Sequence, residues 1–264
     1  MLKIQELHKV FNENTINENK VFDGFSLQVE KGEFISIIGS NGAGKSTLLN
    51  IISGNIQLDS GEIYIDGVNI SNKDEYKRSK IIGRVFQNPS VGIAPNMTIL
   101  ENIALADNKG EKYGLNFGIS KKRIPYYKEL LKELNLGLED KLYTKVSLLS
   151  GGQRQALTLL MATMSNPKLL LLDEHTAALD PKTSVKIMDI TKKIVEDTQI
   201  TTLMITHNLK QAIKTGNRLI MMHQGEVIVD VKGKEKEELT TKKLMKLFEE
   251  ANINEELSDR SLLG

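Results

Sequence analysis

A nine-residue stretch, GSNGAGKST at positions 39–47, constrains the fold of this chain more than any other part of the sequence. It fits the pattern G-x-x-x-x-G-K-[ST], which belongs between a strand and a helix. The preceding run, FISIIG, predicts a buried strand, and the following run, KSTLLNIISG, has apolar residues at helical spacing with Gly54 as a C-cap. A strand, a glycine-rich loop and a helix in this order predict a phosphate-binding loop in an α/β domain.

The residue types in this loop suit a nucleotide triphosphate. Glycines at 39, 42 and 44 let the backbone turn tightly and direct its N–H groups at phosphate oxygens. The helix that begins at Lys45 adds its positive end, and the Lys45 ammonium can reach the terminal phosphates. We expect the Ser46 hydroxyl to ligate Mg²⁺ and Thr47 to hold a phosphate oxygen. A glycine-rich turn that precedes a lysine by chance is the alternative, and the flanking strand and helix argue against it.

Composition excludes several other classes of protein. The 264 residues are 40% hydrophobic, enough for one large domain or two smaller ones, and the net charge of +1 gives no electrostatic argument for a nucleic-acid partner. Without cysteine, disulfide and thiolate chemistry are impossible. The start, MLKIQELHKV, does not resemble a secretory signal, and no apolar run approaches the roughly 18 residues that span a bilayer. We therefore expect a soluble, cytoplasmic protein that reaches membranes only through a partner.

The rest of the chain reads as an α/β core with a helical insert. Residues 88–147 have helical rather than strand periodicity, unlike the segments on either side. We expect DSGEIYIDG to be a short edge strand, RLIMMHQGEVIVDV to be a hairpin with its turn at Gln224-Gly225, and the last segment to be an amphipathic helix with Leu244, Leu247 and Phe248 in phase.

Two further stretches suggest a site for charged ligands. In LLSGGQRQ, residues 148–155, two glycines follow Ser150 at a predicted helix start, where bare N–H groups suit a close-approaching anion. In LLLLDEHTAALDP, residues 169–181, an apolar run typical of a strand buried on both faces ends in Asp173 and Glu174. Taken alone, the first stretch would be explained by a serine-capped helix and the second by a strand that ends in solvent. Beside a phosphate loop, both favour a nucleotide site.

These motifs together resemble the ATP-binding cassette (ABC) family, the nucleotide-binding subunits of ABC transporters. GSNGAGKST matches the Walker A motif, LSGGQ at 149–153 the family signature, LLLLDE the Walker B motif with its catalytic glutamate, and AALD at 177–180 the D-loop. Gln87 in VFQNP matches the Q-loop glutamine, and His207 matches the switch histidine. The resemblance covers about residues 2–231 in the family's order.

The resemblance implies a fold with a P-loop NTPase core and a mainly parallel sheet. It adds an N-terminal antiparallel β subdomain and an inserted helical subdomain. We expect one ABC ATPase domain over residues 1–264, with an α/β core at 1–87 and 148–231, the helical subdomain at 88–147 and a helical C-terminal extension at 232–264.

It also implies an ATPase with Mg²⁺ as its metal. The expected metal ligands are Ser46 and, directly or through water, Gln87 and Asp173. The expected catalytic residues are Glu174, which would act as general base or position the attacking water, and His207, at the γ-phosphate. Because neighbouring residues on a strand point to opposite faces, we expect Glu174 to face away from Asp173, toward the attacking water. The expected ATP contacts are Phe11, Gly39, Ser40, Asn41, Gly42, Ala43, Gly44, Lys45, Ser46, Thr47, Gln87, Ser150, Gly151, Gly152, Gln153 and Asp180.

Some of these contacts depend on the family's mode of assembly. Phe11 would stack on adenine, with Phe22 and Phe25 as competitors for that role. In the family, ATP lies at the interface of a head-to-tail homodimer, so Ser150, Gly151 and Gly152 would contact the γ-phosphate of the partner's ATP, with Asp180 at the seam.

The same resemblance implies partners in a membrane. The chain would energise an ABC transporter whose permease docks near Gln87 and the helical subdomain, and it would sit on the inner face of the membrane. Three segments, SVGIAPNMTILENIALA, DEHTAALDPKT and GNRLIMMHQGEVIVDVKG, resemble an importer subgroup for amino acids, including aromatic ones, which works with a solute-binding protein. A non-transport ABC ATPase and a P-loop regulatory switch are the alternatives. We expect no nucleic-acid partner.

His175 departs from the family pattern, which has proline after the glutamate. Asp-Glu-His could be read as a metal cluster, but the chain has four histidines and none at zinc-site spacing to this one. We therefore expect a structural substitution. Losing the proline frees one backbone N–H and relaxes the restriction on Glu174.

Overall fold

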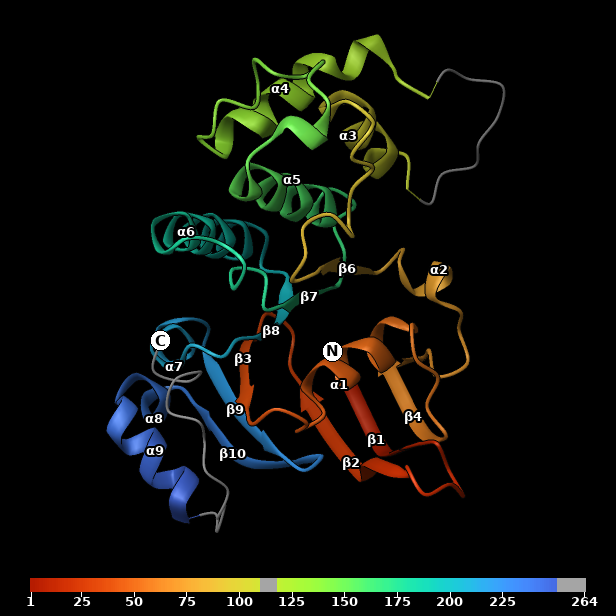
Figure 1. Ribbon diagram of the computed structural model, residues 1–264, viewed down its shortest axis with the longest axis vertical. Helices are drawn as coiled ribbons and strands as arrows, with labels where there is room; N and C mark the ends of the chain where they lie inside the picture. Colours follow the sequence, from red (N-terminus) through yellow and green to blue (C-terminus); the bar gives the residue numbers. More distant parts are fainter. Residues whose placement is uncertain (110–117, 251–264) are drawn as a thin grey trace. The chain divides into compact units, whose positions relative to one another are not determined.

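A computed structural model describes residues 1–109 and 118–250 of the chain (Figure 1). The chain divides into two compact units. The first unit contains residues 1–79 and 201–264, and the second contains residues 80–200. The subdomain boundaries expected from the sequence stay predictions.

The first unit contains an antiparallel sheet with the strand order β2-β1-β4-β5. Its strands are β1 (Leu2–Phe11), β2 (Asn19–Val29), β4 (Ser60–Ile65) and β5 (Val68–Asn69). The expected edge strand is β4, and this expectation is wrong, because β4 lies between β1 and β5. The turn that joins β4 to β5 is Asp66-Gly67, with φ of 49° and 76°, a sequence typical of tight hairpins.

The other strands of the first unit are β3 (Phe34–Gly39), β8 (Thr201–Ile205), β9 (Arg218–His223) and β10 (Glu226–Lys232). β3 pairs in parallel with both β8 and β9, while β10 pairs antiparallel with β9. Every residue of β3 and β8 is buried, as expected for strands covered on both faces. The predicted hairpin turn is confirmed, with φ of 44° at Gln224 and 80° at Gly225.

The helices of the first unit are α1 (Lys45–Ser53), α2 (Glu75–Arg78), α7 (Leu209–Lys214), α8 (Lys234–Glu237) and α9 (Thr241–Glu250). α1 begins at Lys45 and is capped by Gly54 at φ 89°, as predicted. Leu244 and Phe248 of α9 are buried in one apolar cluster with Leu209 and Val229, which confirms the amphipathic terminal helix.

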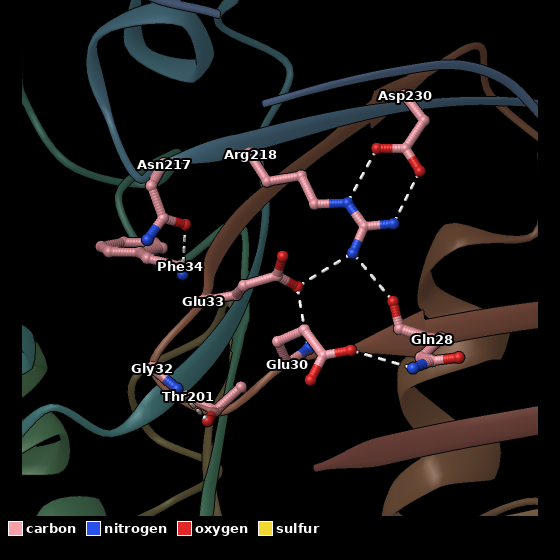
Figure 2. Close-up of polar contacts among 9 residues, drawn as sticks. All are labelled: Gln28, Glu30, Gly32, Glu33, Phe34, Thr201, Asn217, Arg218 and Asp230. Carbon is pink, nitrogen blue, oxygen red and sulfur yellow. Dashed lines mark hydrogen bonds and ion pairs between the residues drawn. The ribbon is translucent and has the colours of Figure 1, made fainter. Parts of the chain in front are cut away.

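Arg218 joins the two groups of strands in the first unit (Figure 2). Its guanidinium donates to both carboxylate oxygens of Asp230 on β10, at 2.7 and 2.6 Å. It also donates to Glu33 Oε2, just before β3, at 2.9 Å and to the Gln28 carbonyl of β2 at 2.8 Å. The hydrogen bond to Asp230, followed by the one to Glu33, raises the pKa of Arg218. One side chain thus ties β2 to β9 and β10.

The second unit contains two parallel strands and a helical layer. Its strands are β6 (Ile82–Val85) and β7 (Leu169–Asp173), and its helices are α3 (Ile99–Asp107), η1 (Lys121–Arg123), α4 (Ile124–Glu133), η2 (Val146–Leu148), α5 (Gly151–Thr163) and α6 (Pro181–Thr198). Buried residues from α3, α4, α5 and α6 form one apolar core, which includes Ile103, Leu131, Leu157 and Ile187.

The helical periodicity predicted for residues 88–147 is confirmed by α3 and α4, while residues 110–117 lie outside the described part. α5 begins after Ser150, whose side chain accepts from the Gln153 N–H, so the predicted N-cap is confirmed. Among the helices in the described residues, none is both long and apolar enough to cross a bilayer.

Candidate functional site

The predicted phosphate loop links β3 to α1 in the first unit, and its lysine folds back over it. The Lys45 ammonium donates to the Gly39 and Ser40 carbonyls, each at 2.8 Å, and the residue is 6% exposed. Ser46 is exposed and Thr47 is half-buried. The loop therefore holds a buried cation at its base and places an exposed serine at the start of α1, which suits an anionic ligand at a helix N-terminus.

Two glycines in the loop have no room for a side chain. A Cβ at Gly39 would lie 2.0 Å from the Met222 carbonyl oxygen of β9. Gly44 has a φ of 91°, and a Cβ there would lie 2.9 Å from the Phe22 ring. The tight path of the backbone past its neighbours thus requires glycine at both positions.

The end of β9 also contacts the loop, which the sequence did not indicate. Ser40 Oγ lies 3.4 Å from His223 Nδ1, and the Gly225 N–H donates to the Ala43 carbonyl at 3.3 Å. Only the parallel pairing of β9 with β3 brings the hairpin turn to this edge, and no pattern around His223 predicts that pairing.

His207 leaves the same edge of the sheet as the phosphate loop. β8 pairs in parallel with β3, with Ile205 opposite Ile37, and the Thr206 N–H donates to the Ile37 carbonyl at 3.2 Å. His207 is half-buried, and it is followed by Asn208, whose side chain caps α7. The first unit thus brings the predicted switch histidine and the Walker A loop to one edge, because carboxyl ends of parallel strands meet there.

The predicted adenine-stacking residue ends β1. Phe11 is half-buried, and the Lys9 ammonium lies 5.3 Å from its ring centroid. Its two competitors are core residues, with Phe22 1% and Phe25 6% exposed and their rings 5.1 Å apart. Of these three aromatic residues, only Phe11 has substantial exposed surface, and its role stays a prediction.

Asp173 is the last residue of β7 in the second unit, and it is paired with an arginine. The Asp173 carboxylate lies 3.7 Å from the Arg84 guanidinium, and the two side chains are 16% and 10% exposed. Arg84 lies opposite Leu171 in the parallel pair, so it shares a face with Leu171 and Asp173. The guanidinium also lies 4.4 Å from the Phe86 ring centroid. The sequence interpretation missed Arg84, although a charge within the apolar run of β6 was a signal.

Glu174 lies beyond the strand, so the argument from strand alternation does not apply to it. β7 ends at Asp173, and Glu174 has a φ of 46°, in the left-handed region. Its carbonyl accepts from the Ala177 N–H at 2.9 Å, which closes a turn. The direction of this carboxylate is therefore set by the turn and not by the pleat of the strand.

His175 is a buried residue of this turn. It is 2% exposed, its Nε2 lies 3.0 Å from Thr191 Oγ1 on α6, and burial lowers the pKa of His175 to about 4. The described residues contain no group of three or more His, Cys, Asp or Glu side chains placed to hold a metal ion. His175 is thus a neutral side chain packed under the acidic strand end.

Gln87 lies at the same edge of the second unit as the two acids. It comes two residues after β6 and is exposed, and Val85 of β6 lies opposite Leu172 of β7. The parallel pairing therefore places Gln87, Asp173 and Glu174 at neighbouring strand ends.

The signature packs against the start of α6, which directly follows the D-loop in the second unit. The Ser150 and Gln153 side chains form a reciprocal capping box, and Gln153 Nε2 donates to the Leu136 carbonyl at 3.2 Å. A Cβ at Gly152 would lie 2.2 Å from the Thr183 methyl group. Asp180 caps α6 by accepting from the Thr183 N–H at 3.1 Å. Hydrogen bonding to the Thr183 side chain, followed by that to the Thr183 N–H, lowers the pKa of the Asp180 carboxyl.

Each unit therefore carries one part of the predicted site. The first unit carries Phe11, the Walker A residues and His207, and the second carries Gln87, the signature, Asp173, Glu174 and Asp180. Their roles toward a nucleotide stay predictions.

Comparisons with known proteins identify the family of the chain. A family model described as ABC transporter matches residues 22–177. The tyrosine transport ATP-binding protein of Clostridioides difficile is 53% identical over 251 residues, which cover 95% of this chain and 100% of that protein. A phosphonates import ATP-binding protein of Oceanobacillus iheyensis is 34% identical, with 87% of this chain and 89% of that protein covered.

Solved structures show the same fold. The dimeric, post-hydrolysis structure of the ATP-binding cassette MJ0796 bound to ADP and Pi is 33% identical, with a TM-score of 0.75 over 88% of this chain and 98% of that one. The α/β class and the ABC ATPase fold predicted from the sequence are confirmed. The chain therefore belongs to the ABC transporter family, as one of its ATP-hydrolysing subunits.

Proposed function

We propose that this ATPase drives a bacterial importer of amino acids, with aromatic amino acids as the cargo class. The observation that carries the cargo class is its 53% identity to a tyrosine transport ATP-binding protein over that protein's full length. The identity to phosphonate import proteins is 33–34%. The three segments that resemble an amino-acid importer subgroup in the sequence support the same class.

ATP binds, on this proposal, with its phosphates on the Walker A loop and its adenine on Phe11. The two loop carbonyls that hold the Lys45 ammonium support this role, because they keep the cation at the base of the loop. Mg²⁺ fits the donor set, since the Ser46 hydroxyl, the Gln87 amide and the Asp173 carboxylate offer the oxygen ligands that it prefers. Mg²⁺ would supply charge neutralisation at the phosphates.

Glu174 is the general base in this proposal, and His207 holds the γ-phosphate. The acid's place just past the end of a buried strand, next to Asp173, supports this assignment. ATP lies between two copies of the chain, with Ser150, Gly151 and Gly152 of one copy facing the γ-phosphate held by the other and Asp180 at the seam. A relative that is dimeric with ADP and Pi bound supports the pairing of two copies.

The permease docks on the second unit near Gln87. The apolar side chains of Val91 and Leu105 are 59% and 49% exposed, and an open hollow lined by Met97, Glu101 and Leu105 lies beside α3. Exposed apolar surface of this kind is typical of interaction sites. Through this contact the subunit lies on the inner face of the cell membrane, in a system with a solute-binding protein.

Glu174→Gln tests the catalytic assignment. We expect ATP binding and ATP-dependent dimerisation to persist while hydrolysis falls about 10²- to 10⁴-fold, the usual contribution of a general base. Steady-state ATPase assays and light scattering with ATP measure the two effects. Glu196→Gln, an equal charge change at an exposed site on α6, is the matched control. Near-normal turnover in Glu174→Gln would remove Glu174 from this role.

Reconstitution tests the cargo class. The subunit is assembled with its permease in proteoliposomes, the solute-binding protein is added, and ATPase stimulation and uptake are measured with tyrosine, phenylalanine, an alkylphosphonate and glycine betaine. We expect the aromatic amino acids alone to stimulate both. Stimulation by phosphonate or betaine instead would overturn the amino-acid assignment.

A further inference from the structure

The turn that carries Glu174 is fastened to α6 by a side chain that the proposed mechanism does not use. His175 is 2% exposed, and its Nε2 lies 3.0 Å from Oγ1 of Thr191, which is fully buried. Thr191 lies one helical turn beyond Ile187, a member of the apolar core formed by α3, α4, α5 and α6. The turn is thus anchored to a part of the second unit that is held firmly by packing.

The direction of this hydrogen bond follows from the second contact of Thr191. Thr191 Oγ1 lies 2.8 Å from the Ile187 carbonyl oxygen, which can only accept, so the hydroxyl donates its one proton there. The imidazole must therefore donate to Thr191 through Nε2–H. Burial, which disfavours the charged imidazolium, agrees with a neutral ring that carries its proton on Nε2.

The residue next to this anchor is in an unfavourable backbone conformation. Glu174 has a φ of 46°, where residues other than glycine, asparagine and aspartate are uncommon. Such conformations persist when the surrounding structure holds them. Two bonds contribute to holding this one, namely the Ala177 N–H to the Glu174 carbonyl at 2.9 Å and the tether from His175 to Thr191.

We propose that His175 is a positioning residue for ATP hydrolysis, whose hydrogen bond to Thr191 holds Glu174 in its left-handed conformation and so fixes the Glu174 carboxylate. Proline, which the family pattern has at this place, restricts the preceding residue through its ring. Histidine imposes no such restriction, so Glu174 can adopt the left-handed conformation, which the tether then holds. The proposal rests on the assignment of Glu174 as general base.

Substitutions on Thr191 test the tether without touching the turn itself. Thr191→Val removes the hydroxyl at almost constant volume, and Thr191→Ser keeps it. His175→Leu and His175→Gln form the matching pair, because the glutamine amide keeps a donor. Thr163→Val is the control, since Thr163 is 7% exposed at the end of α5 and its hydroxyl donates to the Leu159 and Leu160 carbonyls.

We expect Thr191→Val and His175→Leu to lower kcat about 10- to 100-fold, the loss typical of a displaced catalytic group, while KM and the affinity for a fluorescent ATP analogue stay within about twofold. Thr191→Ser and His175→Gln should recover most of the rate, and Thr163→Val should keep it. In a Glu174→Gln background, Thr191→Val should lower the residual rate no further, because the group that it positions is gone.

Unchanged kcat in Thr191→Val and His175→Leu would overturn the proposal. So would a parallel loss of kcat, ATP affinity and melting temperature of the kind that a merely structural defect produces. The proposed function fails separately. If Glu174→Gln itself keeps near-normal turnover, the general base is another residue. If Glu174→Gln is inactive while the tether variants are fully active, only the role of His175 is refuted.

Discussion

Arg218→Met removes a cation that four acceptors share in the first unit (Figure 2). The methionine side chain is unbranched and can occupy much of the same path, so the change mainly deletes charge and hydrogen bonds. Asp230, Glu33 and the Gln28 carbonyl each lose the guanidinium as a donor, while Glu33 keeps the hydrogen bond from the Glu30 N–H. The network lies at the amino end of β3, whereas the phosphate loop follows its carboxyl end, so we expect stability to change and kcat to be kept.

The exposure of each partner sets the magnitude. Removing one member of a buried ion pair costs about 3–5 kcal/mol, because the other charge is left unpaired. The Glu33 side chain is 13% exposed, so most of this loss comes from leaving its charge unpaired. Asp230 is 39% exposed, and water can solvate much of its charge. We therefore expect the free energy of unfolding to fall by about 2–4 kcal/mol. At about 2–4 °C per kcal/mol, the melting temperature should fall by about 4–16 °C.

Thermal unfolding of Arg218→Met, followed by circular dichroism and calorimetry, measures this loss. Lys20→Met is the matched control, because it deletes an ion pair with Asp23 in which both side chains are more than half exposed. We expect no measurable shift there. Asp230→Asn should cost less than Arg218→Met, since Glu33 still pairs with the arginine. A melting temperature for Arg218→Met as high as that of Lys20→Met would refute the argument that burial makes this network stabilising.

Two further outcomes follow from the site. Lys45→Ala should lose ATP binding, because it removes the cation held at the base of the phosphate loop. Titration with a fluorescent ATP analogue measures the affinity, with Lys31→Ala, at an exposed lysine, as the control. Unchanged affinity in Lys45→Ala would count against the loop assignment. Ser150→Ala should cost about 1 kcal/mol of stability through loss of the α5 N-cap, which lowers the melting temperature by about 2–4 °C. In a Glu174→Gln background it should also weaken ATP-dependent dimerisation. Dimerisation at full strength would remove Ser150 from the interface.

Local patterns were sufficient to predict the elements around the phosphate loop. FISIIG became β3, α1 begins at Lys45 and ends before Gly54, and α5 follows the Ser150 cap. These features depend on short-range rules of burial, helix dipoles and capping, which a run of about ten residues contains in full.

Interactions between segments far apart in the sequence could not be predicted in this way. β4 was expected to be an edge strand, and the two-residue β5 covers that edge through a turn at Asp66-Gly67. Arg84 and His223 were missed because each reaches the site residues only through the pairing of its strand, β6 with β7 and β9 with β3. Alternation of apolar and polar residues is what marks register in a sequence, and parallel strands that are buried on both faces lack it.

Glu174 shows the limit of sequence reasoning most clearly. The pattern LLLLDE places two acids at a strand end, and the pleat of an ideal strand would send their side chains to opposite faces. β7 ends one residue too early for that rule, and Glu174 turns into the left-handed region, which glutamate has no intrinsic tendency to adopt. The cause lies elsewhere in the chain, because His175 is held by a threonine 16 residues further on. If the tether acts as proposed, the direction of the catalytic carboxylate is a tertiary property, and a hydroxyl on α6 should affect the rate as strongly as many residues that touch the nucleotide.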